Sequence, residues 1–139
     1  MDEKIIPEVH KDSFFSRPDR VLTGRHEEAM RADLYVLTTG WNFRRFRQAW
    51  KNYQDFARRV KQAGAQLWVV EAALHARDFV IGINDPVPPD YLLQVTAESE
   101  LWHKERMLNL LMKRLPLTAQ YIAVVDGDVR FLRDDWANE

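Results

Sequence analysis

The order of apolar segments along the chain predicts an α/β fold with a mostly parallel sheet. The segments run strand, helix, strand, strand, helix, strand, which is typical of domains that alternate the two element types. Three strands, at 34–38, 67–71 and 121–126, are apolar or aromatic up to their last position, and a further strand is expected near 91–95. A strand that is apolar on both faces needs helices on each side, so we expect these three as neighbouring central strands.

The N-terminal residues differ in character from the rest. They carry Pro7, Pro18, many charges and no sustained period, which predicts an irregular arm over residues 1–30, with one short helix near 27–31. Residues 31–139 are then expected to form a single domain, because a chain of 139 residues suits one domain rather than two.

A long helix is expected after the first strand, from Asn42 as its N-cap to Gly64, whose position is typical of a left-handed C-cap. Its apolar residues recur at helical spacing and form one stripe. These are Phe43, Phe46, Trp50, Tyr53 and Val60. We therefore expect Trp50 in the core, and Arg44, Arg45 and Lys51 in solvent. An uncovered Trp50 would favour self-association through that patch.

A second helix is expected over 100–114, with Ser99 as its cap. Trp102 and Asn109 share one of its faces, while Lys104 points elsewhere. Trp102 is expected in the core. Periodicity alone leaves Lys104 and Asn109 on the surface of the helix.

The composition excludes several classes of function. With 20 basic and 21 acidic residues the net charge is −1, which gives no electrostatic footprint for nucleic acid or an anionic membrane. The absence of cysteine excludes disulfides and thiolate zinc sites, and four scattered histidines predict no metal site. No apolar run approaches the roughly 18 residues that span a bilayer. The N-terminus lacks the apolar region of a signal peptide, so a cytoplasmic protein is expected.

Polar side chains stand where three of the predicted strands end. They are Thr38, Thr39, Glu71, Asp126 and Asp128. Ligands of an open parallel sheet bind beyond the carboxyl ends of its strands, so these side chains are expected at one site. Two carboxylates separated by a glycine can face one point, because glycine lets the chain turn sharply. They form a hard oxygen ligand set suited to Mg²⁺ or Mn²⁺, which usually complete their shell with water and substrate phosphates.

The tripeptide Asp126-Gly127-Asp128 is also compatible with a plain solvated turn, since an Asp-Gly pair after a strand is a common turn signal. Its surroundings favour a site instead. Five apolar or aromatic residues precede Asp126, so this carboxylate leaves a buried strand, and Phe131 and Trp136 after it are typical of a packed lid.

Two segments and the residues around them resemble a known family. The segment 101–109 reads Leu-Trp-His-Lys-Glu-Arg-Met-Leu-Asn, and 121–131 reads Tyr-Ile-Ala-Val-Val-Asp-Gly-Asp-Val-Arg-Phe, with Asp135-Trp136 following. Together they resemble the DxD segment of glycosyltransferases of the GT-A fold, in which a helix carrying Lys-Glu or Arg and an Asn precedes the DxD strand. The runs 35–39 and 68–71 look more loosely like the first two nucleotide-binding strands of that family.

The resemblance implies a Rossmann-like GT-A domain, with a mostly parallel sheet flanked by helices, that transfers a sugar from a UDP- or GDP-sugar to an unknown acceptor. Asp126 and Asp128 would hold Mn²⁺ or Mg²⁺ against the diphosphate, with Asp126 near the metal or the ribose, and Glu71 would face the base. The remaining implied donor-site residues are Thr38, Thr39, Lys104 and Asn109. Members of the family continue after DxD with the acceptor site and the catalytic base. The chain is therefore expected to be the donor-binding half, truncated after the DxD strand, with the base beyond residue 139.

Two other classes of function remain open. A TOPRIM-like nuclease or primase domain also arranges a Glu and a DxD around Mg²⁺, as Glu71 and Asp126 with Asp128 would here. Against this alternative, Ala72 replaces the glycine that usually follows the Glu, and the balanced charge offers no track for nucleic acid. The second alternative is a non-catalytic module that binds sugar nucleotides.

Overall fold

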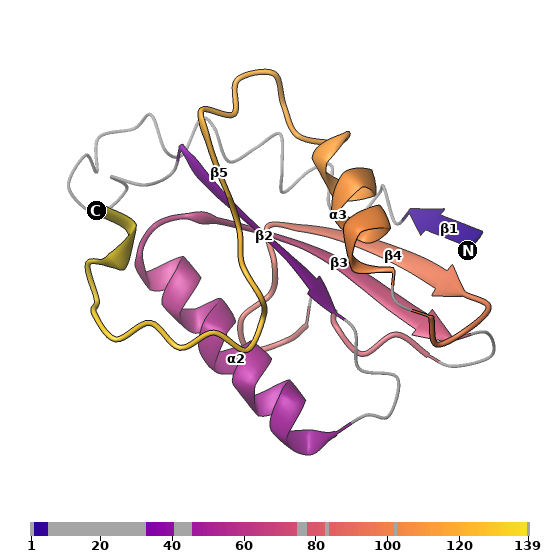
Figure 1. Ribbon diagram of the computed structural model, residues 1–139. Coiled ribbons are helices and arrows are strands. Elements are labelled where there is room, and N and C mark those ends of the chain that lie inside the picture. The colour runs from indigo at the N-terminus through magenta and orange to yellow at the C-terminus, as the bar shows by residue number, and fades with distance from the viewer. Residues whose placement is uncertain are drawn as a thin grey trace.

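The computed structural model describes residues 2–5, 33–40, 46–74, 78–82, 84–101 and 103–138 of the chain. After a first short strand, the described elements follow in the order strand, helix, two strands, helix and strand (Figure 1). The elements are β1 (Asp2–Ile5), β2 (Leu34–Gly40), α2 (Arg47–Gln62), β3 (Gln66–Leu74), β4 (Tyr91–Ala97), α3 (Lys104–Met112), β5 (Tyr121–Val124) and the short 3-10 helix η1 (Trp136–Asn138).

The five strands form one sheet in the order β1-β4-β3-β2-β5. β2, β3, β4 and β5 are parallel, and only β1 runs antiparallel, against β4. In the centre of the sheet, Leu37 of β2 lies opposite both Trp68 of β3 and Val124 of β5. The prediction of an α/β fold with a mostly parallel sheet is therefore confirmed.

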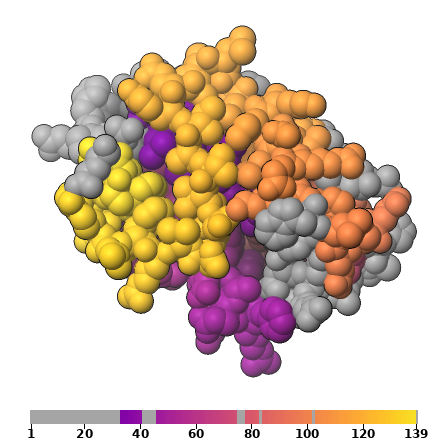
Figure 2. Space-filling view, viewed as in Figure 1, coloured from indigo at the N-terminus to yellow at the C-terminus, as the bar shows by residue number. Residues whose placement is uncertain are grey.

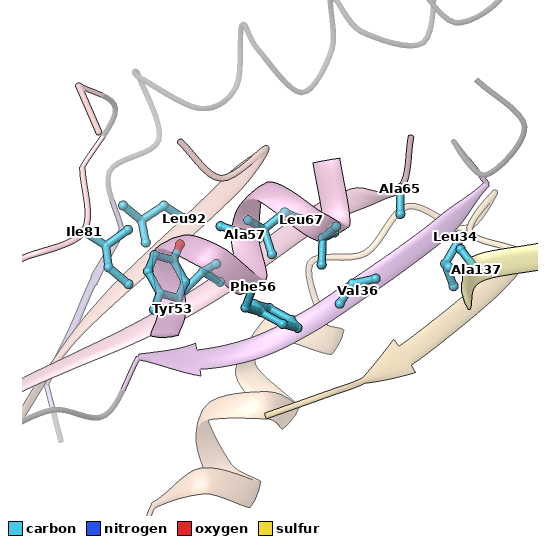
Figure 3. Close-up of a cluster of buried hydrophobic side chains, with 12 residues drawn as sticks. Leu34, Val36, Tyr53, Phe56, Ala57, Ala65, Leu67, Ile81, Leu92 and Ala137 are labelled. Carbon is cyan, nitrogen blue, oxygen red and sulfur yellow. The ribbon is translucent and has the colours of Figure 1, made fainter. Parts of the chain in front are cut away.

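Helices cover both faces of the sheet. Successive side chains of a strand point to opposite faces, so apolar side chains lie on both. On one face Val36 and Leu67 pack against α2, in a buried cluster with Phe56 of that helix (Figure 3). On the other face Leu37 and Trp68 pack under α3, in a cluster with Met107 and Leu111. Fully burying a large apolar side chain contributes about 1.5–3 kcal/mol, so these two clusters fix the helices on the sheet.

The position of β5 corrects one prediction. β5 does lie next to β2, but it is the last strand of the sheet rather than a central one. Tyr121, Ile122 and Val124 are 52%, 49% and 45% exposed. Figure 2 shows residues of this region, in gold, on the surface of the molecule. The apolar composition is that of a covered strand, whereas the strand order leaves one side of β5 open in the described part of the chain.

The ends of the helices also differ from expectation. α2 begins at Arg47 with Phe46 in an extended conformation before it, so Asn42, which lies outside the described residues, is not its cap. Gly64 has φ 76° after the last turn of α2, as predicted. α3 begins at Lys104 rather than at 100, and it has no side-chain cap, so the cap assigned to Ser99 is wrong.

Other sequence predictions concern single residues and the N-terminal arm. Lys51 is exposed as expected, and Trp50 is half-buried against the core cluster under α2. Asp2–Ile5 form a strand of the sheet, so the arm is not irregular throughout. The remaining calls fall on residues that the structure does not describe, namely Trp102, Arg44, Arg45 and the short helix near 27–31. Among the described residues, no helix is both long and apolar enough to cross a bilayer.

Candidate functional site

A pocket of about 590 Å³ opens at the carboxyl ends of β2, β3 and β5. It brings together five of the residues expected from the sequence: Thr39, Glu71, Lys104, Asp126 and Asp128. This convergence follows from the parallel strands, whose carboxyl ends share one edge of the sheet. Thr38 lies beneath the pocket and is fully buried. Asn109 is exposed and does not line the pocket.

The acidic motif is a turn that also faces the pocket. The amide of Val125 donates to the carbonyl of Leu37 at 3.0 Å, which continues the pairing of β5 with β2 to the edge of the sheet. The amide of Val129 then donates to the carbonyl of Asp126 at 3.1 Å and closes the turn. Asp126 and Asp128 both line the pocket, so the turn interpretation and the site interpretation describe the same segment.

The space around Gly127, and not its backbone conformation, disfavours a larger residue there. The chain turns at Gly127 as expected, but Gly64 is the only described glycine with positive φ, so the turn does not depend on a left-handed glycine. A Cβ atom at Gly127 would lie 3.2 Å from Oγ1 of Thr38 and 3.6 Å from Cδ2 of Tyr53. The turn is therefore seated directly on β2 and α2, and this seating sets the height of the two carboxylates above the sheet.

Asp126 is paired within the protein. Its carboxylate accepts a hydrogen bond from the ammonium of Lys104, the first residue of α3, in an ion pair whose side chains are 57% and 26% exposed. Two unpaired acids this close would repel each other, but Asp126 has Lys104 as its partner. Helical periodicity placed Lys104 away from the site, whereas the resemblance to the DxD segment indicated it.

Glu71 shapes one wall of the pocket. Its side chain is 5% exposed. One oxygen accepts the Val80 amide at 2.6 Å, and the other accepts the Ile81 amide and the side-chain amide of Gln94, both at 3.1 Å. Burial raises the pKa of Glu71, while these hydrogen bonds oppose the rise. A Cβ atom at Gly40 would lie 2.9 Å from Ile81, so the segment that Glu71 holds packs tightly against β2.

Two hydroxyl groups under the pocket have no hydrogen-bond partner among the described residues. They belong to Thr38 and Tyr53, and both oxygens are buried. Burial raises the pKa of Tyr53, with Asp85 and Glu71 adding to the rise. A buried hydroxyl without a partner costs stability. Of these two residues, Tyr53 lines the pocket, whereas Thr38 does not.

The first turns of α2 supply a wall that the site analysis of the sequence missed. Phe46, Trp50 and Tyr53 line the pocket, and the rings of Trp50 and Tyr53 stack with centroids 5.6 Å apart. The signal was present, since these residues are the start of the predicted apolar stripe. They were assigned to the core because periodicity does not show where a helix passes the edge of the sheet.

The donor set suits a hard divalent ion only in part. In the described part of the chain, no group of three or more His, Cys, Asp or Glu side chains could hold a metal. Asp126 and Asp128 provide two carboxylates on the same pocket wall. Mg²⁺ is usually bound by one or two carboxylates together with water and substrate phosphates. The residues therefore fit an ion that arrives with, or is completed by, a phosphate ligand.

No protein-family model, curated protein or solved structure gives a significant match to this chain. The functional argument therefore depends on the pocket and on the chemistry of the residues that line it.

Proposed function

We propose that this chain is the donor-binding part of a metal-dependent glycosyltransferase with a GT-A fold. The observation that carries the proposal is the meeting of Asp126, Asp128, Lys104 and Thr39 in one pocket at the carboxyl edge of a parallel sheet. Its volume of about 590 Å³ lies within the range of ligand pockets. The ligand that suits it is a nucleoside-diphosphate sugar, for example of UDP or GDP, together with Mn²⁺ or Mg²⁺.

Each side of the pocket has a part in binding such a donor. Asp126 and Asp128 would hold the ion, which offsets the diphosphate charge and acts as a Lewis acid on the leaving group. Lys104 lies at hydrogen-bond distance from Asp126 and can reach a phosphate at the same place. The stacked rings of Trp50 and Tyr53 offer an apolar surface to the base or the sugar.

In the proposed reaction, the bond between the anomeric carbon of the sugar and the diphosphate oxygen breaks, and the electron pair leaves with the nucleoside diphosphate. The acceptor hydroxyl forms the new bond to the anomeric carbon and gives up its proton. The described residues position the leaving group, and none of them is assigned as the base for that proton.

The state of Glu71 supports this function over the TOPRIM-like alternative. That alternative needs the Glu as a metal ligand beside the two aspartates. Both oxygens of Glu71 instead accept hydrogen bonds from the amides of Val80, Ile81 and Gln94. A donor site needs two carboxylates for its metal ion, and Asp126 and Asp128 line the pocket. The same hydrogen bonds also count against the role facing the base that the resemblance implied for Glu71.

The test is ligand-dependent stability. Mn²⁺ should raise the melting temperature, and UDP or GDP should raise it further, because a ligand at a hundredfold excess over its Kd stabilises the native state by about 2.7 kcal/mol. Asp128→Asn should abolish both increments and still fold. Asp134→Asn is the matched control, since Asp134 is 97% exposed and lies outside the pocket.

A wild-type melting curve that neither Mn²⁺ nor a nucleoside diphosphate shifts would refute the proposal. Release of nucleoside diphosphate from a sugar nucleotide, measured with and without acceptor mixtures, separates a transferase from a non-catalytic binding module. The module would show the shifts in melting temperature without turnover.

A further inference from the structure

The ion pair between Lys104 and Asp126 occupies the place where a metal ion would bind. Lys104 comes from the first position of α3 and reaches Asp126 at the end of the strand segment, and both side chains line the pocket beside Asp128. An ammonium and a divalent cation repel each other when both contact one carboxylate, because like charges at that distance are costly. The pair and the metal therefore compete for Asp126.

We propose that Lys104 acts as a built-in competitor that keeps free metal out of the pocket until a nucleoside diphosphate arrives. In the protein without ligand, the ammonium partly neutralises the acidic turn. A metal ion bound alone would place three positive charges against the two carboxylates of Asp126 and Asp128. A diphosphate supplies the missing negative charge, and it also gives the ammonium a new partner. This inference rests on the proposed function, and it concerns the order in which donor and metal bind.

The chemistry of lysine allows this exchange of partners. Its ammonium is a compact charge on a flexible four-carbon stem, so it can turn from Asp126 to a phosphate within the same pocket. The pair is partly exposed on both sides, so solvent screens it and little stability is lost when it opens. A buried pair could not open in this way without a large cost in desolvated charge.

The inference predicts opposite effects of one substitution on two affinities. Lys104→Met removes the competitor, so Mn²⁺ alone should bind about two- to fivefold more tightly. The same change removes a charged hydrogen-bond donor for the phosphate, so UDP or GDP in the presence of saturating Mn²⁺ should bind about tenfold more weakly or worse. In the wild type, metal and nucleotide should each strengthen the binding of the other, and this coupling should shrink in the variant.

The experiment is isothermal titration of the full chain with Mn²⁺ alone, with UDP or GDP alone, and with each nucleotide at saturating Mn²⁺. The matched control is Arg106→Met, which removes the same charge from an exposed position two residues along α3 and outside the pocket. It should change neither affinity. Circular dichroism checks that each variant is folded, and Lys104→Gln serves as a second variant that keeps a polar end.

Three results would overturn the inference. The first is that Lys104→Met and Lys104→Gln leave the Mn²⁺ affinity unchanged. The second is that they weaken the binding of Mn²⁺ and of the nucleotide alike. The third is that Arg106→Met reproduces their effect. If the wild type binds Mn²⁺ with nucleotide and the opposite effects are absent, only the inference about Lys104 fails. If the wild type binds neither Mn²⁺ nor the nucleotides, the proposed function fails, and this inference fails with it.

Discussion

Replacing Gly127 by alanine tests how the acidic turn is seated. The added methyl group would lie 3.2 Å from Oγ1 of Thr38, which is fully buried in a central strand, and 3.6 Å from the ring of Tyr53. Overpacking of this kind costs about 1–3 kcal/mol. Because φ of Gly127 is not positive, alanine also brings the usual gain of about 0.4–1 kcal/mol from a stiffer unfolded chain. We therefore expect a net loss of up to about 2.6 kcal/mol.

Gly82→Ala is the matched control, because a Cβ atom there meets only Asp85, at 4.0 Å. Gly82→Ala should show the gain in stability from a stiffer unfolded chain without the loss from overpacking. The free energies of unfolding of the two variants should therefore differ by about 1–3 kcal/mol. Urea unfolding followed by tryptophan fluorescence measures both values, with the slope m as a check on the unfolded state. If Gly127→Ala proved as stable as Gly82→Ala, the turn would not rest on Thr38, and the reasoning about carboxylate height would be wrong.

Four further predictions concern buried polar groups. Glu71→Ala should cost about 2–4 kcal/mol in urea unfolding, because it leaves buried amide donors without an acceptor, and a loss under about 1 kcal/mol would contradict its role in the pocket wall. The raised pKa of Glu71 means that the folded protein holds this proton more tightly than the unfolded chain. Its contribution to stability should therefore decline as the pH rises from 4.5 through that pKa, a slope that Glu71→Gln should remove. Asp90→Ala should cost about 2–3 kcal/mol, since Asp90 is 1% exposed and pairs with Lys61, whereas Asp55→Ala breaks an exposed pair and should cost under about 0.5 kcal/mol in the same assay. Tyr53→Phe removes a buried hydroxyl without a partner, so the melting temperature should stay the same or rise.

The sequence predicts the sheet well where local composition is decisive. The runs that became β2 and β3 are apolar on both faces, and only a strand between two helical layers uses such a run. The same reasoning failed for β5, because an edge strand can have the same apolar composition as a central strand. Strand order depends on how crossovers pack, which is a property of the whole chain. The strand Asp2–Ile5 was missed because its pairing with β4 is non-local and its residues are mostly charged.

For the candidate site, the sequence predicts where the site lies on the sheet better than it predicts which side chains contact each other there. Thr39, Glu71 and the two aspartates meet because parallel strands put their carboxyl ends on one edge. The sequence does not predict which group each acid contacts. The pair of Asp126 with Lys104 depends on α3 beginning four residues later than expected. The hydrogen bonds of Glu71 depend on a segment without regular structure, whose path no periodic pattern encodes.

The two edges of the sheet differ in how they can be extended. At one edge, β1 supplies Asp-Glu-Lys, and charged residues discourage a further strand from pairing. At the other edge, β5 reads Tyr-Ile-Ala-Val, and no described strand pairs with its outer side. The backbone groups along that side form a template for another strand, whether from the same chain or a neighbouring molecule. Within the described part of the chain, a further strand would therefore join the sheet at β5 rather than at β1.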